Sequence, residues 1–190
     1  DAIDDPNTVT VAQVAPAVHA AWAEQFGLDS EFATPKRMVA ALRELGFNYV
    51  FDTDFAADLT IMEEGSEFLE RFTHKKNYRW PMFTSCCPAW VKYLENENPK
   101  YLKNISTCKS PMEMVGAIFR DKYAAKDAAD GRTTYHIAIM PCTAKKFETK
   151  RENQSASGYP DVDYSLTTRE LGRMIESAGI FFKHLPDEEF

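Results

Sequence analysis

The sequence predicts an α/β fold, in which a mostly parallel sheet carries helices on both of its faces. Short segments rich in β-branched and aromatic residues alternate with longer helical segments along the chain. Several helical segments begin at a proline and end at a glycine, which is the usual asymmetry of helix termini. Strands that alternate with helices build βαβ units, and their strands lie parallel. Because the 190 residues contain no internal repeat or flexible linker, we expect one lobe.

The first half of the chain has clear strand and helix boundaries. Thr8–Val14 is dominated by β-branched residues and predicts a buried strand. A helix at Val18–Phe26 follows and is stopped by Gly27. The next helix, Thr34–Leu45, opens with a capping threonine and a first-turn proline. We then expect a short strand at Phe47–Phe51 and a long amphipathic helix at Ala56–Phe72.

The second half continues the alternation. The apolar run Trp80–Phe83 predicts a third strand, and Pro88–Glu95 predicts a helix. Ser110 and Glu113 have the spacing of a capping box and open a helix to about Lys126. The remaining elements are a strand at Tyr135–Met140, a polar loop at Thr149–Asp161, a strand at Val162–Leu166, and a helix capped by Thr167 and Glu170 that ends at Gly179.

The composition excludes several classes of function. A net charge of −7 argues against nucleic acid or an anionic membrane as a partner. No run of 18 or more apolar residues exists, so we expect no membrane span. Four cysteines without a Cys-x-x-Cys pair are too few for a disulfide scaffold or a local zinc site. Reduced thiols are therefore expected, and with them a cytoplasmic location, the periplasm being the alternative.

Three segments that contain proline fall at the ends of predicted strands: Ala15–Ala17, Thr84–Pro88 and Met140–Lys145. In open α/β sheets, ligands bind beyond the carboxyl ends of the strands. The adjacent cysteines of the second segment precede a helix N-terminus, which favours the thiolate. Two interpretations stay open from the residues alone. The thiols are small buried side chains, or they converge on one soft metal centre as Cys86, Cys87 and Cys142.

Two of these segments resemble the first two signature motifs of the iron–iron hydrogenases. Thr84-Ser85-Cys86-Cys87-Pro88 is similar to the first motif. The second is matched by Met140-Pro141-Cys142-x-x-Lys145-x-x-Glu148. The similarity covers nearly the whole chain and includes Val14–Val18, Leu59–Glu67, Ser110-Pro111 and Thr167–Leu171. It implies that residues 1–190 are the first lobe of a hydrogenase catalytic domain, a fragment of a longer protein that interconverts protons and H₂.

The resemblance implies a cofactor, the H-cluster, in which a 4Fe–4S cubane is joined by a cysteine to a di-iron site with CO, cyanide and a dithiolate bridge. Cys87 and Cys142 match two of the four cubane ligands. Cys86 matches the thiol that passes protons to and from the bridging amine. Lys145 matches a lysine that contacts a cyanide ligand, which suits a cation facing an anion. The matched wall positions are Ala15, Pro16, Pro111, Met140 and Pro141.

A proton relay from Cys86 to solvent is also implied, with Glu64, Glu67, Ser106 and Arg71 at the matched positions. Glu64, Glu67 and Arg71 follow the spacing i, i+3, i+7 and form one stripe along a helix. The residues alone do not indicate a relay, because apolar side chains take the other side of this helix. Such a charged stripe is typical of a solvated helix surface.

Three features depart from the family pattern. The third motif, which supplies the other two cubane cysteines, is absent, and we expect the remainder of the catalytic domain to supply them. Met112 stands where many members carry glutamine, which weakens one polar contact at the site. Cys108 has no matched ligand role, and we interpret it as a small buried residue.

The implied partners are H₂ and protons, together with ferredoxin or another redox protein that is reached through accessory iron–sulfur domains. Two alternatives remain: a non-catalytic relative used in iron–sulfur cluster assembly, and a sensory hydrogenase with slow turnover. The resemblance implies that assembly relatives lack the Cys86-type thiol. Retention of Cys86, Glu64 and Glu67 therefore favours the catalytic class.

Overall fold

The computed structural model describes residues 2–32 and 34–190, and its centre is a four-stranded sheet in the order β2-β1-β3-β4. All neighbouring strands pair in parallel, and Val14 of β1 pairs with Asp52 of β2 and with Ile139 of β3. The predicted parallel α/β class is confirmed. The strands are β1 (Thr8–Val14), β2 (Tyr49–Asp52), β3 (Thr133–Met140) and β4 (Tyr164–Thr167).

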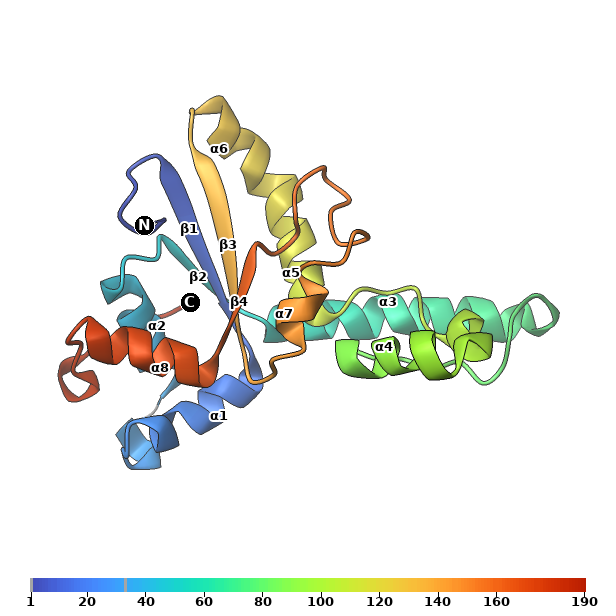
Figure 1. Ribbon diagram of the computed structural model, residues 1–190, viewed down its shortest axis with the longest axis horizontal. Helices are drawn as coiled ribbons and strands as arrows, with labels where there is room; N and C mark the ends of the chain where they lie inside the picture. Colours follow the sequence, from blue (N-terminus) through green and yellow to red (C-terminus); the bar gives the residue numbers. More distant parts are fainter. Residues whose placement is uncertain (1, 33) are drawn as a thin grey trace.

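Helices cover both faces of this sheet (Figure 1). On one face lie α1 (Pro16–Gln25), α2 (Pro35–Glu44) and α8 (Thr168–Ser177). The other face is covered by α5 (Pro111–Phe119) and α6 (Ala125–Ala129), which a π-helical turn at Arg120–Ala124 joins into one rod. The larger apolar core lies under the first group of helices and includes Ala12, Val14, Trp22, Leu42 and Ile139.

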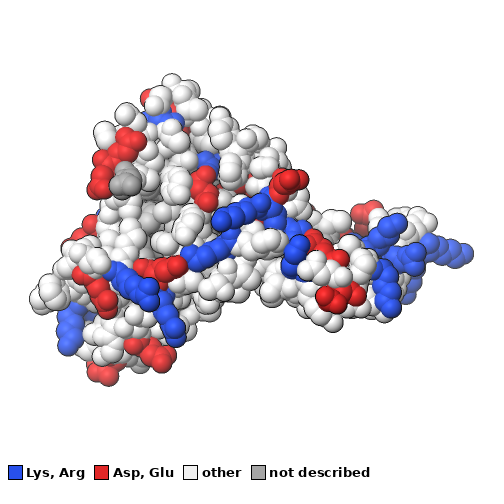
Figure 2. Space-filling model, viewed as in Figure 1, with Lys and Arg blue, Asp and Glu red and all other residues white. Residues whose placement is uncertain are grey.

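Two further helices project from the sheet as an arm, α3 (Asp54–Thr73) and α4 (Pro88–Glu97) (Figure 1). A 3₁₀ helix, Pro99–Asn104, follows α4 on the arm, and the short helix α7 (Lys145–Glu148) packs against α4. Figure 2 shows lysine and arginine gathered at the far end of the arm, where Lys75, Lys76 and Arg79 are exposed. Within residues 2–32 and 34–190, no helix is long and apolar enough to cross a membrane.

The strand order places a topological switch point between β1 and β3. From β1 the chain goes to β2 on one side, and it returns to β3 on the other side of β1. In an open parallel sheet, the helices that follow the strands on either side of such a point diverge and leave a crevice. Ala15, the N-cap of α1, and Pro141, which follows β3, lie at this crevice. The fold therefore brings two of the proline-marked segments together.

The predicted strand Trp80–Phe83 is wrong. Only Phe83 pairs there, in an isolated parallel bridge with Ile105. The Phe83 N–H donates to the Asn104 carbonyl at 2.8 Å, and the Phe83 carbonyl accepts from the Ser106 N–H at 2.7 Å. Pro81 has no N–H to continue the ladder, and its carbonyl accepts from the Asn104 side chain instead. The segment therefore supports the arm rather than the central sheet.

The two predicted capping boxes differ in outcome. At the start of α8, the box of Thr167 and Glu170 is complete, with both reciprocal bonds formed. At the start of α5, the Ser110 hydroxyl accepts from the Glu113 N–H at 3.5 Å, but the Glu113 carboxyl does not return the bond. This carboxyl is buried in the protein instead.

Gly116 marks where α5 touches the loop before β4, and it gives a test of the packing. A Cβ at Gly116 would lie 2.4 Å from the Asp161 carbonyl oxygen, so we expect Gly116→Ala to destabilise the protein by about 1–3 kcal/mol. Gly65 on α3 has nothing within 4 Å of the same added atom. Gly65→Ala should therefore stabilise the protein by about 0.5–1 kcal/mol. Denaturant unfolding measures both changes, and equal effects at the two glycines would contradict the packing described.

Candidate metal centre and proton relay

The two cysteine segments meet at one cavity of about 340 Å³ at the carboxyl ends of β1 and β3. Its lining is almost entirely apolar apart from the cysteines, one threonine and one lysine. The predicted ligand, thiol and wall residues lie together here as Ala15, Pro16, Cys86, Cys87, Pro111, Met140, Pro141, Cys142 and Lys145.

Local structure fixes the first cysteine pair. The Ser85 hydroxyl accepts from the Cys87 N–H at 3.0 Å, which turns the chain just before α4. Cys87 is the N-cap of α4 and Pro88 is its first residue, where the missing N–H costs nothing. Cys86 and Cys87 are exposed, whereas Cys142 is half-buried.

Lys145 joins the two motifs. Its Nζ donates to the Cys86 carbonyl at 2.7 Å and to Glu148 Oε2 at 2.6 Å. Glu148 is buried, with 6% of its surface exposed, so this ion pair is shielded from water. A fixed cation at the edge of an apolar cavity attracts an anionic group there.

A buried hydrogen-bond network supports the wall opposite the cysteines. Gln13 on β1 donates from Nε2 to the Met112 carbonyl at 2.9 Å, and its Oε1 accepts from the Thr53 hydroxyl at 3.1 Å. His136 Nε2 lies 3.1 Å from Gln13 Nε2 and must accept, so His136 Nδ1 carries the proton toward the Asp161 carbonyl. Complete burial lowers the pKa of His136 to about 3, which keeps the ring neutral.

Two lining residues of the cavity lie outside every segment that we singled out in the sequence: Thr53 and Ala57. Thr53 directly follows β2, so the predicted strand could have indicated that Thr53 lies at the carboxyl edge of the sheet. Ala57 has no polar group and no motif, so nothing in the sequence points to it.

The predicted relay residues form a second group, centred on Glu67. Ser106 Oγ donates to Glu67 Oε2 at 2.6 Å, and the Thr107 N–H donates to the same oxygen at 3.0 Å. Arg71 Nε donates to Glu67 Oε1 at 2.9 Å, and its Nη2 donates to the Ile105 carbonyl at 2.9 Å. Arg71 is only 3% exposed, so this is an ion pair within the arm rather than on its surface.

The two glutamates of the stripe have their pKa values moved in opposite directions. Burial raises the pKa of Glu64, and the negative charge of Glu67 raises it further. Burial alone would raise the pKa of Glu67 as well, but hydrogen bonds from Ser106, Arg71 and Thr107 outweigh it and lower the pKa. Neighbouring carboxyl groups with separated pKa values are suited to proton transfer.

Helix α3 buries its polar stripe and exposes its apolar side. Arg71 is buried, and Glu64 and Glu67 are half-buried. The expectation that this charged stripe is a solvated surface is therefore wrong. The apolar side chains that face solvent are Phe55, Ile61, Met62, Phe68, Leu69 and Phe72, with exposed fractions from 44% to 71%. A contiguous apolar face of this size is characteristic of an interaction surface.

A second cavity of about 290 Å³ is lined by residues that neighbour both groups. It is lined by Ser85, next to the cysteine pair, and by Ser106 of the stripe. Cys108 also lines it and is half-buried, with Sγ 3.9 Å from Glu67 Oε2. Burial raises the pKa of the Cys108 thiol, and the carboxylates of Glu67 and Glu64 add to the effect. Our interpretation of Cys108 as a small buried residue thus holds only in part.

The donor set of the first cavity is incomplete for a metal cluster. No disulfide joins the four cysteines, all of which are described. Within the described ranges, no group of three or more His, Cys, Asp or Glu side chains could hold a metal ion. In the interpretation drawn from the sequence, Cys87 and Cys142 are two soft sulfur ligands, whereas an iron–sulfur cubane takes four. The cavity is thus chemically suited to part of such a cluster, with further ligands required from elsewhere.

Comparison with known proteins agrees with this chemistry. Residues 8–190 match the family model of the iron-only hydrogenase large subunit, C-terminal domain. The chain is 47% identical over 97% of its length to the large subunit of the periplasmic Fe hydrogenase of Nitratidesulfovibrio vulgaris. It is similar in structure, with a TM-score of 0.89 and 43% identity over 98% of the chain, to an apo FeFe-hydrogenase from Chlamydomonas reinhardtii. The chain belongs to the iron-only hydrogenase large-subunit family.

The family also contains proteins of another kind. The chain is 34% identical over 93% of its length to the cytosolic iron–sulfur assembly component 3 of Rattus norvegicus. It spans 44% of the Nitratidesulfovibrio subunit, 47% of the Chlamydomonas chain and 38% of the rat protein. Membership therefore establishes the fold and the family, and the activity of the whole protein is a separate question.

Proposed function

We propose that this chain forms one wall of the H-cluster site of an iron–iron hydrogenase, which catalyses 2 H⁺ + 2 e⁻ ⇌ H₂. The observation that carries the proposal is that Cys86, Cys87 and Cys142 line one apolar cavity together with Lys145. When bound, the 4Fe–4S cubane and the di-iron site with its CO, cyanide and dithiolate ligands would supply the redox chemistry. Cys87 and Cys142 would be two of the cubane ligands.

The residues of this chain would then handle protons and charge. Cys86 lies in the cavity beside the ligand cysteine and would act as a general acid and base through its thiol. Lys145, held by Glu148 and by the Cys86 carbonyl, would stabilise an anionic ligand such as cyanide. Ala15, Pro16, Pro111, Met140 and Pro141 would exclude water from the reacting atoms.

Glu64, Glu67, Ser106 and Arg71 would form a relay between Cys86 and solvent, in which the glutamates and Ser106 carry protons and Arg71 holds Glu67 in position. The support is the hydrogen bond of Ser106 to Glu67 and the separated pKa values of the two glutamates. The ion pair with Arg71 and the hydrogen bonds from Ser106 and Thr107 would keep Glu67 charged and fixed in position.

The remainder of the catalytic domain would supply the other two cubane cysteines. The exposed apolar side of α3 supports such a partner, because its polar stripe is already covered while its apolar side chains are in water. Electrons would come from ferredoxin or another redox protein, through accessory iron–sulfur domains outside these 190 residues. The cytoplasm or the periplasm would house the protein, in line with the two locations that the names of its relatives give.

Hydrogen production by the complete protein tests this proposal. After maturation with iron, and with a low-potential electron donor, we expect sustained evolution of H₂. An assembly protein would hold an iron–sulfur cluster without producing H₂, and a sensory hydrogenase would bind H₂ with slow turnover. Absence of H₂ turnover from a protein that carries its full cofactor would contradict the catalytic assignment.

A further inference from the structure

Glu113 is a buried acid that the proposed mechanism does not use. It lies in the first turn of α5, directly after the cavity residues Pro111 and Met112, and it is completely buried. Among the described residues, neither of its carboxyl oxygens has a hydrogen-bond partner. An ionised carboxylate without partners is strongly disfavoured in a protein interior, so this group retains its proton.

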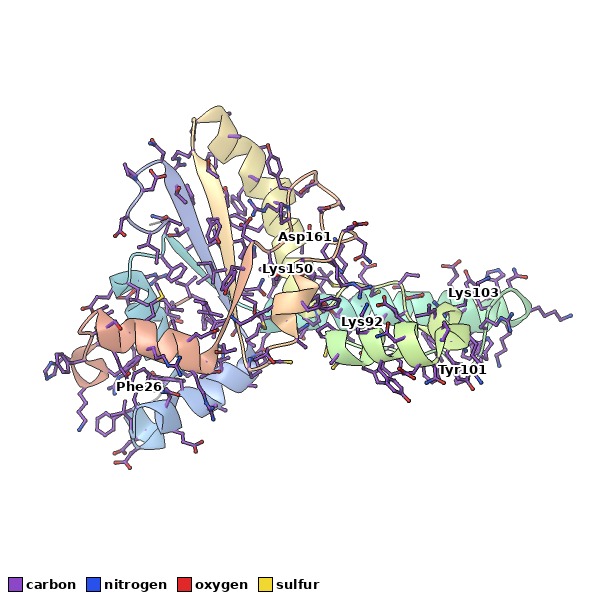
Figure 3. All side chains as sticks on the ribbon, in the orientation of Figure 1. Phe26, Lys92, Tyr101, Lys103, Lys150 and Asp161 are labelled. Carbon is purple, nitrogen blue, oxygen red and sulfur yellow. The ribbon has the colours of Figure 1, made fainter. Side chains whose placement is uncertain are left out.

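Two lysine–acid pairs lie near enough to Glu113 for their charges to act on it. Lys145 pairs with Glu148 on α7, and Lys109, which precedes α5, pairs with Asp161. Asp161 is drawn close because Gly116, one turn beyond Glu113, lets α5 approach the Asp161 backbone. Asp161 lies in the loop that packs on this side of α5 (Figure 3).

Charge counting in this cluster points to one bound proton. Two lysines and three carboxyl groups are electrically neutral only when one carboxyl is protonated. Burial raises the pKa of Glu113 to about 8, and Glu148 and Asp161 add to this rise, whereas Lys109 and Lys145 oppose it. On the sheet side, His136 is neutral and provides no further positive charge.

We infer that Glu113 holds one proton behind the cavity wall, and that this proton sets the charge that Lys145 presents to the cavity. While the proton is bound, Lys145 keeps a net positive field toward an anion in the cavity. When the proton leaves, the cluster gains one negative charge and that field weakens. Glu113 is thus a positioning residue that acts through Lys145; only the identity of the anion rests on the proposed function.

An infrared pH titration of the complete protein without metal tests the inference directly. The wild type should show one protonated carboxyl band that disappears with a midpoint near pH 8, well above the ordinary range of glutamate. Glu113→Gln should lack that band. Glu95→Gln is the matched control, since Glu95 also pairs with a cation, Arg151, but lies at the surface of the arm. A wild type without this band, or a band that persists in Glu113→Gln, would overturn the inference.

Stability gives a second readout on the same metal-free protein. The folded state holds the Glu113 proton from its ordinary pKa of 4.5 up to about 8, while the unfolded chain releases it. Stability from this group is therefore complete below pH 4.5 and is lost as pH rises through about 8. The denaturant midpoint of Glu113→Gln, relative to wild type, should rise across this window. A pH-independent difference would overturn the inference.

In the protein that carries its cofactor, the cyanide infrared band should shift with pH, with a midpoint near 8, and should lose this shift in Glu113→Gln. An unchanged shift in the variant would overturn the role assigned to Lys145. Absence of cyanide bands altogether would count against the proposed function, while the metal-free titrations would still decide the role of Glu113.

Discussion

Exchange of Cys86 for serine in the complete protein is expected to retain iron and the CO and cyanide bands while H₂ turnover falls by about two orders of magnitude or more. The reason is chemical, because a thiol releases its proton near neutral pH, and an aliphatic hydroxyl group does not. Cys86 lies in the cavity but leaves the two ligand positions to Cys87 and Cys142 in our proposal. Iron analysis and infrared spectra measure whether the cofactor is retained, and H₂ production measures the loss of turnover.

The same exchange at Cys108 is the matched control. Cys108 does not line the cysteine cavity, so turnover should fall far less in Cys108→Ser than in Cys86→Ser. Near-normal turnover in Cys86→Ser would contradict the role of the thiol. Loss of the infrared bands in that variant would show that Cys86 holds the cofactor instead of carrying protons.

The second large effect concerns the cofactor itself. The 190-residue chain alone is expected to lack CO and cyanide bands, and the complete protein to show them. In our proposal, this chain contributes two of the four sulfur ligands that a cubane needs. The exposed apolar side of α3 is also left in water when the chain is alone. Removal of either Cys87 or Cys142 from the complete protein leaves three ligands, and should likewise abolish the bands.

The local elements that form the cavity could be predicted from the sequence because each has a local cause. Pro16, Pro88 and Pro111 each lie at the start of a helix. Because β1 and β3 are parallel, the segments that follow these two strands lie at the same edge of the sheet. The resemblance predicted that Cys87, Cys142 and Lys145 lie together at that edge, and in the structure all three line one cavity. Their roles as ligands and as an electrostatic contact remain predictions.

Long-range packing is what the sequence could not provide. Helical periodicity places Glu67 and Ile61 on different faces of α3, but it does not indicate which face the rest of the protein covers. Glu113 has the spacing of a capping box, and the close approach of α5 to Asp161 places its carboxyl in the interior instead. The apolar run that contains Pro81 has the composition of a strand, but among the described residues it pairs only through the bridge of Phe83 with Ile105 in the arm.

The infrared spectrum of the matured protein, recorded with iron analysis, tests the central claim most directly. The account predicts CO and cyanide bands in the complete protein, and none in Cys87→Ala, in Cys142→Ala or in the 190-residue chain. Glu95→Gln, which changes a carboxyl group on the arm outside the cavity, should keep the bands and controls for mutation as such. Bands in the isolated 190-residue chain, or bands that survive in either cysteine variant, would contradict the assignment of this cavity as one wall of the H-cluster site.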